Sequence, residues 1–127
     1  TEFIDAMQDG FNSYLSQEAT NISGGQKQRI SIARAIVKRP EIYIFDDSFS
    51  ALDFRTDANL RAALKPITRN STVFIVAQRV STVMNADRII VLDNGNMVGL
   101  GTHKELLNTC EVYREIVTSQ LSEEELA

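Results

Sequence analysis

The sequence has little of several features that would assign it to a common class of proteins. It contains one cysteine, Cys110, which cannot form a disulfide within the chain. Such low cysteine usage is typical of proteins in a reducing compartment. No apolar run approaches the roughly 20 residues that a membrane-spanning helix needs. The net charge of −4 disfavours a nucleic-acid-binding surface, which usually requires a basic patch.

A phosphate-binding loop of the pattern Gly-x-x-x-x-Gly-Lys-[Ser/Thr] is also absent from the sequence. The 127 residues are enough for one small domain or part of a larger one, and 43% of them are hydrophobic, so a core can form. The sequence begins at Thr1 rather than at a methionine, inside a predicted helix. We therefore expect a piece excised from a longer domain.

The stretch around Ser23 predicts the start of a helix. Ser23 is followed three residues later by Gln26, which is the spacing of a capping box. Gly24 and Gly25 lie between them and leave the first backbone N–H groups uncovered by side chains. Together with the helix dipole, these groups favour an anion such as a phosphate. The alternative is that the glycines only suit a tight start of the helix, and these four residues alone do not separate the two.

Polar side chains follow two apolar strands. Asp46 and Asp47 come directly after Ile42–Phe45, and Gln78 follows 72–77. In open α/β sheets, ligands bind at the carboxyl ends of the strands. Two adjacent carboxylates there favour a Mg²⁺-phosphate site, because Mg²⁺ is held by few carboxylates and keeps several waters. The alternative is that one of them caps the turn from Ser48 to Asp53.

The order of the predicted elements indicates an α/β fold, with a mostly parallel sheet flanked by helices. The strands Ile42–Phe45 and 72–77 are almost uniformly apolar, so both are predicted to be covered on both faces. The helix from Gly24 is apolar over most of its circumference and is predicted to be buried. Near the end of the chain, the pattern predicts a hairpin turn at Asn94-Gly95, a second capping box at Thr102 and Glu105, and a closing helix.

Six segments, in order and with compatible spacing, resemble the ATP-binding domain of ABC-type ATPases. One of them, Gln26–Ala35, resembles the helix that follows the signature motif. Asn21–Gln26 resembles the signature motif, with Ile22 in place of the usual leucine, Ile42–Asp46 the Walker B strand, Ser50–Asp53 the D-loop, Val73–Ala77 the strand before the switch residue, and Gly101–Leu107 the ending common in exporters. The resemblance implies a partial P-loop NTPase fold with a C-terminal β-hairpin and helices. Residues 1–127 would be the C-terminal portion of a nucleotide-binding domain that lacks its Walker A half.

The same resemblance implies cofactors, partners and a location. ATP and Mg²⁺ would bind between this chain and a second ABC subunit, and the transmembrane domain of the same full-length chain would be the other partner. Nucleic acid would not be a partner. The domain would lie at the cytoplasmic face of the cell membrane.

Roles follow from the resemblance residue by residue. Asp46 matches the aspartate that holds Mg²⁺. Asp47 occupies the position of the catalytic glutamate, and Gln78 that of the switch histidine. Nucleotide binding would involve the signature residues Ser23, Gly24, Gly25 and Gln26, with Ser23 and Gly25 reaching the γ-phosphate of ATP held by the opposite subunit, and the D-loop aspartate Asp53 would lie at the dimer interface.

Two of these positions depart from the family pattern. Aspartate in place of glutamate retracts the carboxylate of residue 47 by one methylene, and a misplacement of about 1 Å, which is less than this, can cost roughly 100-fold in rate. Glutamine in place of histidine at Gln78 removes an imidazole; losing one donor at developing charge costs on the order of 10²–10³ in rate. Either change alone predicts a slow site, while the signature motif is nearly intact.

The sequence therefore predicts the degenerate-site subunit of a heterodimeric bacterial multidrug-type ABC exporter. The fragment alone is predicted to be inactive, since it lacks the phosphate-binding loop. Two alternatives stay open: a soluble ABC-type ATPase acting on DNA or ribosomes, and a regulatory half that does not hydrolyse ATP.

Overall fold

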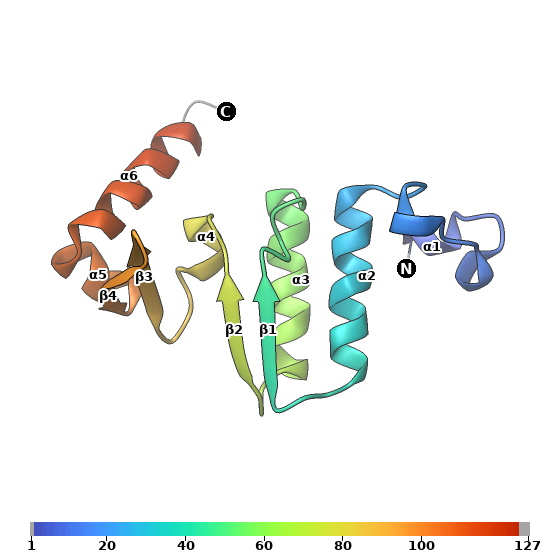
Figure 1. Ribbon diagram of the computed structural model, residues 1–127, viewed down its shortest axis with the longest axis horizontal. Helices are drawn as coiled ribbons and strands as arrows, with labels where there is room; N and C mark the ends of the chain where they lie inside the picture. The colour runs from blue at the N-terminus through green and yellow to red at the C-terminus, as the bar shows by residue number, and fades with distance from the viewer. Residues whose placement is uncertain (1, 125–127) are drawn as a thin grey trace. The chain divides into compact units, whose positions relative to one another are not determined.

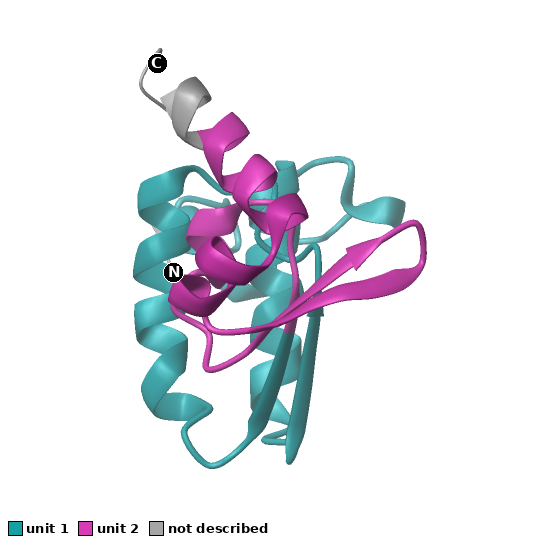
Figure 2. Ribbon diagram, turned by 90° about the vertical axis from the view of Figure 1, so that its left-hand side faces the viewer, with its two compact units in different colours: residues 1–74 teal, residues 75–127 magenta. Residues whose placement is uncertain are grey.

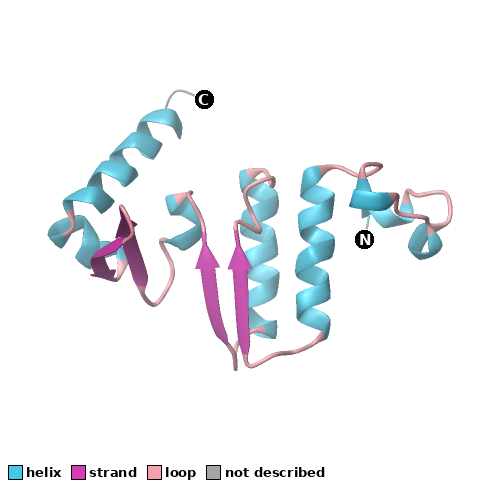
Figure 3. Ribbon diagram, viewed as in Figure 1, coloured by secondary structure: helices cyan, strands magenta, loops and turns pink. Residues whose placement is uncertain are grey.

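The computed structural model describes residues 2–124, and these residues form two compact units. Unit 1 spans Thr1–Phe74 and unit 2 spans Ile75–Ala127 (Figure 2). Helices and strands alternate along the chain (Figure 3), which confirms the predicted α/β class.

Unit 1 begins with short helical segments and continues with two long helices and a strand. In order they are α1 (Glu2–Asp5), the 3-10 turns η1 (Gly10–Asn12) and η2 (Gln17–Ala19), α2 (Gly24–Val37), β1 (Ile42–Asp46) and α3 (Phe54–Ile67). Strand β2 (Thr72–Val76) starts in unit 1 and pairs with β1, and the two arrows point the same way in Figure 1. The pairing begins where Thr72 N–H donates to the carbonyl of Glu41 at 2.8 Å. This order confirms the predicted parallel sheet.

The core of unit 1 lies on one face of β1. Tyr43 and Phe45 are buried and their rings stack at 5.8 Å, while Phe49 packs edge-on against Phe45 at 5.6 Å. Each such buried side chain contributes roughly 1.5–3 kcal/mol of hydrophobic stabilisation. Ile32 of α2 and Leu64 of α3 are also buried. The helices thus cover the face of β1 that carries the aromatic rings.

The predicted burial of the strands and of α2 is wrong for the described structure. Along β1 the exposed and buried residues alternate, and Ile44 is 70% exposed; all three residues of β2 within unit 1 are exposed as well. In α2 only Ile32 is buried, and Val37 is 82% exposed. The reason is that an apolar run shows what a segment can bury, whereas the packing of the described elements covers only one face.

Unit 2 is built around an antiparallel hairpin. It contains α4 (Val80–Val83), β3 (Ile89–Asp93), β4 (Asn96–Gly101), α5 (His103–Thr109) and α6 (Glu111–Glu124). Asn94 and Gly95 form the tight turn of the hairpin, both with positive φ, as predicted. A β-bulge lies between Val91 and Leu92.

Helices α5 and α6 pack on one face of this hairpin. The core comprises Ile89, Val91, Leu106, Cys110, Tyr113 and Val117. Gly99 of β4 is needed there, since a Cβ at this position would lie 2.9 Å from the Cys110 sulfur. Cys110 is therefore a buried, free thiol that serves packing. Within residues 2–124, no helix combines the length and the apolar character required to cross a membrane.

Candidate functional site

The predicted capping box is present at the N-terminus of α2. Ser23 Oγ accepts a hydrogen bond from Gln26 N–H at 3.2 Å, and Gln26 Oε1 accepts one from Ser23 N–H at 2.8 Å. Because a serine hydroxyl also carries one donor hydrogen, Ser23 keeps that hydrogen for another partner. We call this arrangement the Ser23 cap.

The first N–H groups of α2 are open. Ser23 and Gly24 are exposed and Gly25 is half-buried. In the described part of the chain, no group accepts a hydrogen bond from the N–H of Gly24 or of Gly25. Free amides at the positive end of a 14-residue helix form a ready site for an anion.

The two glycines differ in what surrounds them. A Cβ on Gly25 would lie 3.0 Å from the carbonyl oxygen of Ala51 and 3.3 Å from Leu52, whereas a Cβ on Gly24 would meet only Ala51 Cβ at an ordinary 3.6 Å. Close packing against the turn after β1 therefore accounts for the glycine at position 25. The same explanation does not extend to Gly24.

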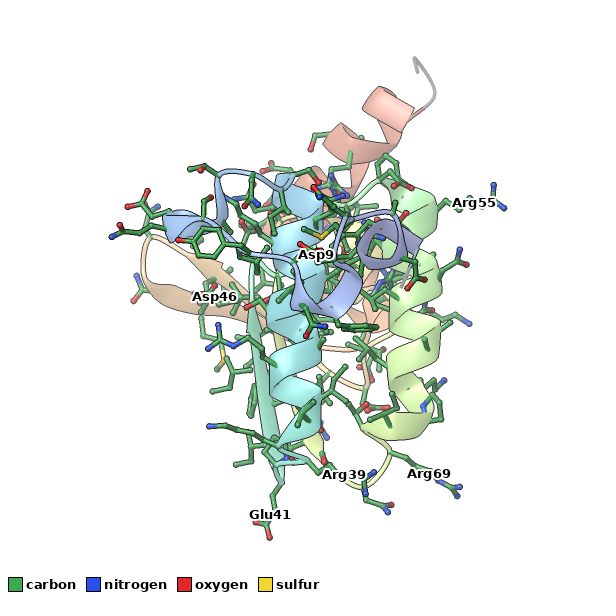
Figure 4. The ribbon with its side chains drawn as sticks, turned by 90° about the vertical axis from the view of Figure 1, so that its right-hand side faces the viewer. Asp9, Arg39, Glu41, Asp46, Arg55 and Arg69 are labelled. Atoms are coloured by element: carbon green, nitrogen blue, oxygen red, sulfur yellow. The ribbon has the colours of Figure 1, made fainter. Side chains whose placement is uncertain are left out.

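The carboxylates follow directly at the end of β1. Asp46 is exposed at the end of the strand away from Glu41, and the basic side chains Arg39 and Arg69 lie at the Glu41 end (Figure 4). Among residues 2–124, the Asp46 carboxylate has no hydrogen-bond donor and no ion-pair partner. It is therefore free to bind a cation.

Asp47 has a different environment from Asp46. Its backbone is in the left-handed region, with φ of 48°, which aspartate tolerates better than most residues. Its Oδ2 atom accepts a hydrogen bond from the Ser50 hydroxyl at 3.0 Å. The turn-capping alternative is thus realised in part, by Asp47 and not by Asp46.

Gln28 of α2 joins the helix to the turn Asp47–Ala51. The sequence placed it in the helix after the signature motif but assigned it no role. Its Nε2 atom lies 3.0 Å from both the Asp47 carbonyl and Ser50 Oγ, and its Oε1 atom accepts from Ala51 N–H at 3.0 Å. A signal for it does exist in the sequence. Gln28 lies three residues after Gly25, on the same side of the helix, which is the side facing the turn.

Asp53 is the N-cap of α3. Its Oδ1 atom accepts from Thr56 N–H at 2.9 Å. Hydrogen bonds from Thr56 hold the pKa of the Asp53 carboxyl below its usual value. This local role explains an aspartate at this position without a ligand, and its place at a dimer interface stays a prediction.

Gln78 lies in unit 2, in the segment just before α4. Its carbonyl accepts a hydrogen bond from Gln120 Nε2 at 2.7 Å, and Gln120 Oε1 accepts from Val80 N–H at 2.7 Å. The Gln78 side chain is exposed. Gln120 of α6 therefore fixes the backbone of the segment that carries Gln78.

The donor set fits a weakly held magnesium ion. Two exposed carboxylates in sequence supply the oxygen ligands that Mg²⁺ prefers, and this ion commonly takes its remaining ligands from water and phosphate. No group of three or more His, Cys, Asp or Glu side chains gathers in the described residues to hold a metal by protein ligands alone.

Comparison with known proteins gives consistent matches. A family model described as "ABC transporter" matches residues 2–50. An uncharacterised ABC transporter ATP-binding protein of Mycobacterium bovis is 49% identical over 112 residues, which cover 88% of this chain and 19% of that protein. An ABC multidrug transporter of Trichophyton tonsurans is 43% identical over 117 residues, which cover 92% of this chain and 9% of that protein.

A solved structure agrees with the sequence matches. It is described as a bacterial Atm1-family ABC exporter with ATP bound; the TM-score is 0.89 and the identity 35%, over 94% of this chain and 21% of that one. The chain thus spans about a fifth or less of the length of these relatives. The sequence matches and the shared fold lead to one conclusion: the chain belongs to the ABC transporter family and corresponds to part of its ATP-binding domain.

Proposed function

We propose that this chain is the C-terminal portion of the nucleotide-binding domain of an ABC exporter and acts in ATP-driven transport. In the full-length transporter, the domain lies at the cytoplasmic face of the cell membrane, joined to the transmembrane domain of its own chain. It pairs with a second, different ABC subunit. ATP with Mg²⁺ is the nucleotide shared between the two subunits.

One observation carries this proposal: the open N–H groups of Gly24 and Gly25 belong to a helix that is held against the turn containing Asp47. The helix N-terminus suits a triphosphate, since it offers amides, a hydroxyl and the positive end of the dipole, with no carboxylate in its first turn. Its exposure suits a phosphate held by another subunit.

The residues of this chain have separate roles in the proposal. Ser23 donates its free hydroxyl hydrogen to a γ-phosphate oxygen, and Gly24 and Gly25 donate their backbone N–H groups, on the nucleotide bound mainly by the partner. Asp46 is the ligand for Mg²⁺, which neutralises phosphate charge when it is bound.

The second site would contain Asp47 and Gln78 and is impaired in this proposal. Asp47 is one methylene shorter than glutamate, and its Oδ2 atom already accepts the Ser50 hydroxyl. A neutral glutamine at position 78 replaces the imidazole that would contact the γ-phosphate. The chain therefore completes a competent site on its partner and turns over ATP slowly at its own.

The test is a gain of function in the full-length transporter assembled with its partner. Asp47→Glu combined with Gln78→His should raise turnover at this site by roughly 10-fold or more, since each change restores a group worth on the order of 10² in rate. Single-turnover ATP hydrolysis measures the effect. An unchanged rate in the double variant would count against an impaired catalytic site.

A regulatory half that does not hydrolyse ATP is the second candidate. The bond from Ser50 to Asp47 favours it, because a carboxylate engaged in its own turn is less available to orient water. Ser50→Ala separates the two: it should release Asp47 and increase residual hydrolysis in a slow catalytic site. In a purely regulatory half, ATP would support subunit association with no hydrolysis in either variant.

A further inference from the structure

The turn after β1 and helix α2 are connected at more than one point. Gly25 allows the backbone of α2 to approach the Ala51 carbonyl, and Leu52 is buried beside it. One helical turn further on, the Gln28 amide makes its hydrogen bonds to Asp47, Ser50 and Ala51. These partners are 19 to 23 residues away in sequence, so the bonds are tertiary.

The Gln28 amide uses both its donor and its acceptor atoms on this turn. Its donor side meets the Asp47 carbonyl and Ser50 Oγ, and the same Ser50 hydroxyl lies 3.0 Å from Asp47 Oδ2. Its acceptor side takes the N–H of Ala51. Contacts on both flanks of the turn restrict the left-handed backbone of Asp47, which is a conformation that most residues avoid.

We propose that Gln28 is a positioning residue that fixes the Asp47 carboxylate relative to the phosphate-binding N-terminus of α2. The inference rests on the proposed function, because it assigns Gln28 to the ATP site formed with Asp47. Gln28 touches neither nucleotide nor metal in this proposal, and it acts through the backbone of the turn. A shift of about 1 Å at a reacting group can cost on the order of 100-fold in rate.

The test uses Gln28→Met in the full-length transporter with its partner. Methionine has a similar length and helix propensity but cannot form these bonds. The first readout is hydrogen exchange at the Ala51 amide, whose acceptor is removed. We expect exchange to accelerate roughly 10-fold or more, with the α2 amides unchanged; unchanged exchange at Ala51 would overturn the proposal.

The second readout is kinetic and is made in the Asp47→Glu, Gln78→His background, in which this site is expected to turn over. Gln28→Met should lower kcat roughly 10- to 100-fold, because the nucleophile-orienting carboxylate moves. KM for ATP should change less than about 2-fold, because the contacts that bind ATP equally in the ground state and in the transition state are retained. A fall in folding stability alone would not produce this split, and an unchanged kcat would contradict the positioning role.

A control variant and a double variant test whether the effects are specific to the Gln28 network. Ser31→Ala on the same helix removes an exposed hydroxyl and should change neither exchange at Ala51 nor kcat. In the exchange readout at Ala51, Ser50→Ala should be non-additive with Gln28→Met, since both residues act on one hydrogen-bond network; additive effects on this exchange would count against the network. If the background itself gains no activity, the proposed function fails, and the exchange measurement still judges Gln28.

Discussion

Two helices of this molecule begin with the same capping box but differ in what they can accept. At the N-terminus of α2, the Ser23 cap pairs Ser23 with Gln26, and at the N-terminus of α5, Thr102 pairs with Glu105. We call the second the Thr102 cap. Both satisfy the N–H groups of the capping residue and of the third helical residue through the same reciprocal bonds, so these bonds do not distinguish the two caps.

The two caps differ in the charge of the third helical residue and in how exposed their first N–H groups are. Glu105 brings a carboxylate to the positive end of α5, where it accepts from the Thr102 N–H at 2.8 Å and from its hydroxyl at 3.0 Å. The Thr102 cap thus supplies its own anion. The Ser23 cap is neutral, and glycines leave its amides open. A capping box is therefore a candidate anion site only when two conditions hold. The third helical residue must be uncharged, and side chains must leave the N–H groups of the first turn exposed.

The largest expected effect comes from exchanging the charge between the two caps. Gln26→Glu keeps the reciprocal bonds of the Ser23 cap but places a carboxylate where we propose a phosphate. Charges a few ångströms apart near a surface interact by several kcal/mol at most, so we expect ATP-dependent association with the partner to weaken roughly 10- to 100-fold. Fluorescence titration with ATP measures this in the full-length pair.

Glu105→Gln is the matched control for that exchange. It makes the Thr102 cap resemble the Ser23 cap, and we assign the Thr102 cap to neither ATP site, so ATP-dependent association should be unchanged. Equal affinities for wild type and Gln26→Glu would remove the anion-binding interpretation of the Ser23 cap.

A smaller effect distinguishes the two glycines of the Ser23 cap. Gly25→Ala should destabilise unit 1 by about 1–3 kcal/mol, because its Cβ would crowd the Ala51 carbonyl. Gly24→Ala meets only ordinary contacts and should be neutral or stabilising by up to about 1 kcal/mol. Thermal unfolding of both variants checks the order. Any loss of ATP-dependent association in Gly24→Ala then reports on phosphate approach rather than on folding.

A third, smaller effect concerns pH. Hydrogen bonds from Thr102 lower the pKa of the Glu105 carboxyl below its ordinary value of 4.5. A carboxyl with a lowered folded-state pKa stabilises the protein above the unfolded pKa, and this stabilisation is lost as the pH falls through the folded pKa. Wild type should therefore melt at a higher temperature than Glu105→Gln at pH 7, and the difference should shrink as the pH falls below 4.5. A difference that persists in acid would show that charge is not the cause.

Unit 1 also contains a buried ion pair, which lies within a single helix. The buried carboxylate of unit 1, Asp57, is 1% exposed and pairs with Arg61 at 2.9 Å. Both residues lie on α3, so the pair stabilises that helix locally. The sequence predicted only that this helix is amphipathic, and it did not predict the ion pair.

The elements were predictable because their signals are local. Both capping boxes, the hairpin turn at Asn94-Gly95 and the position of Asp46 at a strand end follow from residues a few positions apart. The predicted burial was wrong for the opposite reason. Whether Ile44 is covered depends on which other elements pack against β1, and an apolar run carries no information about that.

The sequence by itself determined the α/β order, the caps and the family resemblance. These features depend on hydrogen bonds and side-chain periodicity among residues that are close together in the sequence. Only the tertiary structure decided that Gln28 holds the turn of Asp47, that Gly25 is required by Ala51 and that Asp47 has a left-handed backbone. These features depend on contacts between residues that are about 20 or more positions apart in the sequence, and only the folded chain brings such residues together.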